Sequence, residues 1–85
     1  MDFLLKAEQL VVEAKMTRPS LRDREIGDEL LQDAARYQQH PDCKGLICLI
    51  YDPLHLIANP HGLQSDLEKL SNDRLSVAVV IIPEQ

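Results

Sequence analysis

The sequence predicts an α/β domain of order β-β-α-β-α-β, with a mixed four-stranded sheet flanked by helices. Apolar runs that indicate strands occur at residues 3–5, 10–12, 46–51 and 77–82. Two segments with helical periodicity lie between the later runs. With 45% hydrophobic and 27% charged residues in a chain of 85, the composition is that of a globular protein with one modest core. We therefore expect a single domain over residues 1–85.

The first two strands are predicted to form a hairpin, because two apolar runs flank the polar residues 6–9. A turn centred between Ala7 and Glu8 places Asp2 directly opposite Glu13. Because side chains alternate along a strand, Asp2, Glu13 and Lys15 share one face. The other face then carries Phe3, Leu5, Leu10, Val12 and Ala14.

The first helix is predicted to open between Ser20 and Arg24 and to end near Gln39. Ser20 and Asp23 have the spacing of a capping box. Four apolar residues recur at helical spacing and predict the buried stripe: Ile26, Leu30, Ala34 and Tyr37. The acidic residues are interpreted as a solvated face, with Glu25 as the alternative candidate for a contact with the functional site: Asp23, Glu25, Asp28, Glu29 and Asp33.

The later elements form two crossover units. Residues 46–51 are apolar at every position, which predicts a central strand that is parallel to the hairpin's second strand and covered on both sides. Asp52 follows at its carboxyl end, where a turn or capping role is favoured over a ligand role. Asn59 and Pro60 predict the start of the second helix. Residues 75–82 then form the last strand.

The facing carboxylates of Asp2 and Glu13 predict a metal site. Like charges directly opposed destabilise an antiparallel pair, and a divalent cation between them would reverse the sign. Lys15 would then hold a water, hydroxide or phosphate oxygen nearby, and the metal would stabilise charge on a phosphoryl group. The alternative interpretation is that Glu13 and Lys15 are ordinary charges on a solvated strand face, because a Glu-x-Lys pattern is common.

Asp2, a gap of ten residues, and Glu13-Ala14-Lys15 at the end of an apolar strand resemble the PD-(D/E)xK nuclease superfamily. The likeness is to a restriction-endonuclease-like branch found as the C-terminal nuclease domain of larger bacterial proteins. The resemblance implies that Asp2 and Glu13 are ligands of Mg²⁺ or Mn²⁺, that Lys15 is the catalytic lysine, and that the substrate is DNA. Further segments extend it over nearly the whole chain: 15–18, 25–30, 37–44, 51–53, 59–60 and 62–67.

The resemblance also predicts which parts of the nuclease core this chain contains. Met1 stands where the superfamily signature has Pro, and we expect the domain to lack the helix and strand that normally open the core before Asp2. We expect the sheet face left open to be covered by formation of a homodimer. The alternative function is a catalytically inactive nuclease-fold module that acts in dimerisation or protein assembly.

The charge distribution limits how this domain can bind DNA. A formal charge of −5 opposes tight binding of phosphates by the domain alone. The candidates for nucleic-acid contacts are Lys6, Arg18 and Arg22. The start of the chain lacks the pattern of a secretory signal, no apolar run is long enough to span a bilayer, and Cys43 and Cys48 are too few for a disulfide framework. We therefore expect a cytoplasmic protein with reduced thiols.

Overall fold

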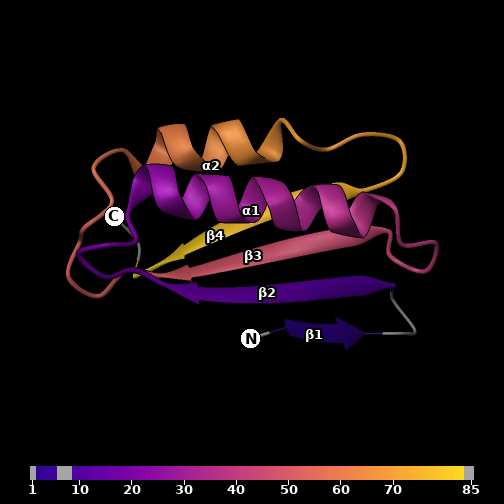
Figure 1. Ribbon diagram of the computed structural model, residues 1–85, viewed down its shortest axis with the longest axis horizontal. Coiled ribbons are helices and arrows are strands. Elements are labelled where there is room, and N and C mark those ends of the chain that lie inside the picture. The colour runs from indigo at the N-terminus through magenta and orange to yellow at the C-terminus, as the bar shows by residue number, and fades with distance from the viewer. Residues whose placement is uncertain (1, 6–8, 84–85) are drawn as a thin grey trace.

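The computed structural model describes residues 2–5 and 9–83 of the chain. The four strands form one sheet in the order β1-β2-β3-β4, in which β1 and β2 are antiparallel and the other neighbours are parallel (Figure 1). The predicted element order and mixed four-stranded sheet are confirmed. The elements are β1 (Asp2–Leu5), β2 (Leu10–Met16), α1 (Asp23–Gln38), β3 (Gly45–Tyr51), α2 (Pro60–Glu68) and β4 (Ser76–Ile82).

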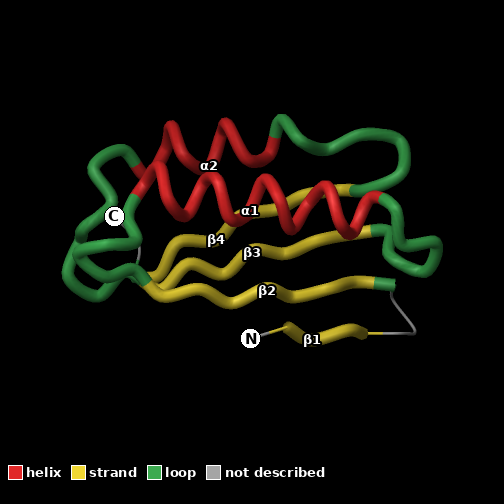
Figure 2. Tube along the Cα trace, viewed as in Figure 1, coloured by secondary structure: helices red, strands yellow, loops and turns green. Residues whose placement is uncertain are grey.

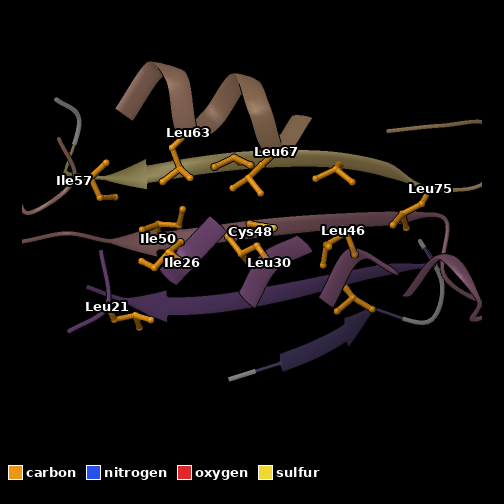
Figure 3. Close-up of a cluster of buried hydrophobic side chains, with 14 of the residues drawn as sticks. Leu21, Ile26, Leu30, Leu46, Cys48, Ile50, Ile57, Leu63, Leu67 and Leu75 are labelled. Carbon is orange, nitrogen blue, oxygen red and sulfur yellow. The ribbon is translucent and has the colours of Figure 1, made fainter. Parts of the chain in front are cut away.

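Both helices lie on the same face of the sheet (Figure 1). The β2–α1–β3 and β3–α2–β4 units both step away from β1, and right-handed crossovers that step in one direction place their helices on one side. The core lies between the helices and the sheet. Its largest fully buried apolar side chains, from α1, β3 and the segment before β4, are Ile26, Leu30, Leu46, Cys48, Ile50 and Leu75 (Figure 3). Leu63 and Leu67 of α2 are buried against them.

The opposite face of the sheet is apolar, and no helix of the described residues covers it (Figure 2). The prediction that β3 is covered on both sides is therefore wrong for the described part of the chain, because both crossovers run over the same face. Ile47 and Leu49 of β3 are only partly buried on this open face. The large apolar side chains most exposed there are Leu5, Met16, Tyr51, Val80 and Ile82.

β4 is an edge strand whose outward polar groups are bonded by side chains. Gln64 Nε2 of α2 donates to the carbonyl of Val79 at 3.0 Å, and the Val79 N–H donates to Glu68 Oε2 at 3.2 Å. Ser71 Oγ accepts from the N–H of Val77 at 2.9 Å and donates to its carbonyl at 3.2 Å. These bonds block the addition of another strand along this part of the edge.

The α1 helix begins where the sequence predicts, but its cap is different. Arg22 is the N-cap, and its N–H donates to Glu25 Oε1 at 3.4 Å. Ser20 lies in a turn that Arg18 and Leu21 close with two backbone hydrogen bonds, so it cannot cap the helix. The predicted Ser20 capping box is therefore wrong, and Glu25 closes the helix start. By contrast, the predicted Asn59 cap of α2 is confirmed, because its side-chain oxygen accepts from the N–H of Gly62 at 3.0 Å.

Candidate functional site

The hairpin register is the one predicted from the sequence. Asp2 pairs with Glu13, and Leu4 pairs with Val11. The side chain of Asp2 lies outside the described part of the structure. Its backbone position is nevertheless fixed directly across the ladder from Glu13. Because directly paired residues project to the same side of a sheet, position 2 belongs to the face that carries Glu13.

Glu13 is buried beneath the helical layer. It is 5% exposed, and its neighbour in β3 is the fully buried Cys48. The side chain of Lys15, two residues along β2, is 15% exposed. The interpretation of Glu13 and Lys15 as ordinary charges on a solvated strand face is therefore wrong. A carboxylate is costly to bury without compensating charges or hydrogen bonds, and this one lies beside an ammonium group.

The ammonium of Lys15 lies among carboxylates of two elements. Its Nζ is 2.9 Å from Glu29 Oε1, 3.1 Å from Asp33 Oδ2 and 3.7 Å from Glu13 Oε1. Burial lowers the pKa of Lys15, but hydrogen bonds and attraction from Glu29 and Asp33 outweigh it and raise the pKa to about 12. Lys15 is therefore a fixed positive charge at neutral pH, suited to stabilising an anion rather than accepting a proton.

Glu29 and Asp33 are the residues that sequence reasoning missed. They were assigned to a solvated face, but both reach from α1 to β2, and the Asp33 side chain is only 14% exposed. Asp33 Oδ1 also lies 3.5 Å from Arg36 Nη2. The available signal was their position: each directly precedes a stripe residue, Leu30 or Ala34, so they flank the buried stripe one helical turn apart.

The exposed arginines of the predicted DNA interface follow the carboxyl end of β2. Arg18 and Arg22 are both exposed, and Arg22 Nε donates to the carbonyl of Leu56 at 3.3 Å. They lie in the segment between β2 and α1, which begins two residues beyond Lys15. Lys6, the third predicted contact, lies outside the described residues.

Asp52 ties this loop to the loop after β3. It is fully buried and accepts hydrogen bonds from Thr17 Oγ1 at 2.6 Å, from the N–H of Leu56 at 2.8 Å and from the N–H of Ile57 at 3.0 Å. The predicted turn role of Asp52 is confirmed. Its contacts hold the segment after Lys15 in place.

Comparison with known protein families shows which family this chain belongs to. The chain matches the model of the DpnII-MboI restriction endonucleases (REase_DpnII-MboI) over residues 1–84. It belongs to this family. Comparison with curated proteins and with solved structures gave no match. The family confirms the predicted relation to restriction-endonuclease-like PD-(D/E)xK nucleases and makes this chain a nuclease-like domain.

Three further observations concern the metal-ligating side chains, the thiols and the helices of this DpnII-MboI domain. Among the residues whose side chains the structure describes, which exclude Asp2, no group of three or more His, Cys, Asp or Glu residues is arranged to hold a metal ion. Cys43 and Cys48 are both buried free thiols. Burial, together with the charge of Glu13, raises the pKa of Cys48 to about 12. No helix of the described residues is long and apolar enough to cross a membrane.

Proposed function

We propose that this domain hydrolyses phosphodiester bonds in DNA, using Mg²⁺ or Mn²⁺ held by Asp2 and Glu13. The observation that supports this most is the position of Lys15, whose ammonium lies 3.7 Å from Glu13 on the face that also carries position 2. Lys15 would stabilise negative charge on the attacking oxygen or on the phosphoryl group. Exposed Arg18 and Arg22 would contact neighbouring phosphates, with Lys6 as a further contact.

The residues present fit a divalent cation. Glu29, Asp33 and Glu13 supply three carboxylates against the two cations Lys15 and Arg36, so this cluster carries a formal charge of −1 before Asp2 is counted. Hard cations prefer carboxylate oxygens, and Glu13 and Asp2 would supply them. The bound ion would polarise the scissile phosphate and help generate a nucleophile from water.

Manganese binding tests the metal site without requiring cleavage. Titration of Mn²⁺ should broaden the backbone resonances around Glu13 selectively, and Glu13→Gln should abolish this broadening while the rest of the spectrum is retained. Asp66→Asn is the matched control, because Asp66 is an exposed carboxylate on α2. Uniform or absent broadening in the wild-type protein would refute the proposed metal site.

Cleavage of supercoiled plasmid in the presence of Mn²⁺ tests the activity itself. Glu13→Gln and Lys15→Met should each lower cleavage by about 100-fold or more, since each removes a charge that acts on the reacting phosphate. Because the domain's formal charge is −5, DNA binding by the isolated domain should be weak and should decrease as salt is added. Wild-type protein that binds Mn²⁺ but cuts no DNA would favour the non-catalytic function.

We also propose a cytoplasmic location, in keeping with the reduced thiols of Cys43 and Cys48.

We further propose that the domain forms a homodimer through the open sheet face. Four strands about 4.8 Å apart, three of them about 23 Å long, give a face of about 400 Å². Two such faces would bury about 800 Å², which is below the about 1,200 Å² of a standard stable interface and corresponds to a weak dimer. A second copy suits this face because sheets pack face to face through apolar side chains.

Sedimentation tests the dimer directly. The wild-type protein should be dimeric at high micromolar concentration, and Val80→Lys should make it monomeric by placing a charge on the open face, where Val80 is 44% exposed. Leu54→Lys is the control, because Leu54 is 73% exposed in a loop outside the sheet. A monomeric wild-type protein at that concentration would reject the proposal. The apolar face is also the observation that favours the alternative function, an inactive nuclease-fold module acting in assembly.

A further inference from the structure

The α1 helix presents two carboxylates to the proposed catalytic lysine. Glu29 and Asp33 are one helical turn apart, and both project from α1 towards β2, where Lys15 lies between them. Their oxygens are 2.9 and 3.1 Å from Lys15 Nζ, whereas the nearest Glu13 oxygen is 3.7 Å away. The ammonium is therefore held by the helix more closely than by the residue beside it on the strand.

We propose that Glu29 and Asp33 are positioning residues that hold Lys15 beside Glu13 without letting it pair closely with Glu13. An ammonium group has three N–H donors, and two carboxylates on α1 engage it from the helix side. This positioning role rests on the proposed function: it limits competition between the Lys15 ammonium and a divalent cation for the Glu13 oxygens, and it keeps the positive charge within reach of a phosphate.

The two carboxylates differ in how firmly they are held. The Asp33 side chain is 14% exposed and is also paired with Arg36, so it is the fixed contact. The Glu29 side chain is 46% exposed and lies nearer the solvent. Loss of Asp33 should therefore release Lys15 more completely than loss of Glu29. A released Lys15 would move towards Glu13 and compete with a cation for the same oxygens.

A double-mutant cycle on Mn²⁺ affinity separates positioning from simple charge. With Lys15 present, Asp33→Asn should raise the Mn²⁺ dissociation constant about tenfold, within the range of coupling between contacting residues. In a Lys15→Gln background the same change should have an effect of about twofold or less, because no ammonium remains to compete. Asp28→Asn, an exposed carboxylate on the same helix, should have little effect in either background.

A second readout observes the ammonium directly. In the wild-type protein the Lys15 NH₃⁺ resonance should show restricted motion and slow exchange, unlike that of the exposed Lys69. Asp33→Asn should make the Lys15 resonance mobile, Glu29→Gln should do so partly, and Asp28→Asn should leave it unchanged. Glu29→Gln keeps the test possible if Asp33→Asn does not fold, because the Glu29 side chain is half exposed.

The outcomes distinguish this inference from the proposed function. Equal effects of Asp33→Asn with and without Lys15 would overturn the positioning role. If the wild-type protein binds no Mn²⁺, the metal-dependent function fails, and the NH₃⁺ resonance then decides the inference alone. A Lys15 resonance as mobile as that of Lys69 would overturn it, whereas a restricted resonance released by Asp33→Asn would support it.

Discussion

The buried carboxylate of Asp52 offers the sharpest test of how the two loops beside the site are held together. Asp52 Oδ1 accepts from Thr17 Oγ1 and from the N–H of Leu56, and Oδ2 accepts from the N–H of Ile57. The change Asp52→Asn keeps the shape of the side chain but replaces one acceptor oxygen with an NH₂ donor. In its best orientation the amide oxygen keeps the Thr17 and Leu56 bonds, and the NH₂ group faces the N–H of Ile57.

The cost follows from those contacts. One hydrogen bond to a charged acceptor is lost and a buried N–H is left facing another donor, so the free energy of unfolding should decrease by about 2–3 kcal/mol. A domain of this size has a total stability of about 4–13 kcal/mol, so the variant should fold but melt about 10–20 °C lower.

Urea unfolding followed by circular dichroism measures this loss. The midpoint should decrease while the slope with denaturant stays constant. Asp73→Asn is the matched control, because Asp73 is exposed, and it should change stability by less than about 0.5 kcal/mol. If the two variants were equally stable, the assignment of Asp52 as the residue that joins the two loops would be refuted.

Three further predictions concern other parts of the fold. A methyl group at Gly27 would lie 3.6 Å from Leu63 Cδ1, an ordinary contact, so Gly27→Ala should raise the urea-measured stability by about 1 kcal/mol, and a decrease would contradict this. Because the Cys48 pKa is raised from 9.0 to about 12, the unfolded chain releases this proton first, and stability should decrease by about 1 kcal/mol between pH 9 and 10. A Cys48→Ala variant should show a smaller decrease, and an unchanged one would exclude this thiol as its source. Glu68→Ala should cost about 1–2 kcal/mol and speed hydrogen exchange at the Val79 amide, and exchange at the wild-type rate would show that Glu68 does not cover this edge.

The fold could be predicted from the sequence because its signals are local. The hairpin register follows from a short polar break between two apolar runs, and the pairing of Asp2 with Glu13 is confirmed. The start of α2 follows from the Asn59–Pro60 pair, whose asparagine accepts from the N–H of Gly62. Turns and caps of this kind depend on residues that are neighbours in the chain, so they can be predicted from a single sequence.

What could not be predicted depends on how the elements pack. The apolar pattern of β3 indicates burial on two sides, but both crossovers pass over one face, and no local pattern determines that. Similarly, the sequence pattern indicates that Glu29 and Asp33 face solvent. They contact Lys15 only because α1 packs over β2. Ser20 has the composition of a cap, but the Arg18–Leu21 turn takes its segment out of the helix.

The side-chain bonds along β4 affect how an assembly of this domain would grow. Open-ended fibres need a surface that joins a different surface on the next copy, and a bare strand edge is the usual means. Here Gln64, Glu68 and Ser71 occupy the backbone groups of Val77 and Val79. A dimer formed through the open sheet face uses the same surface on both copies. Within the described part of the chain, no third copy could then add through that surface, and the assembly would stop at two chains.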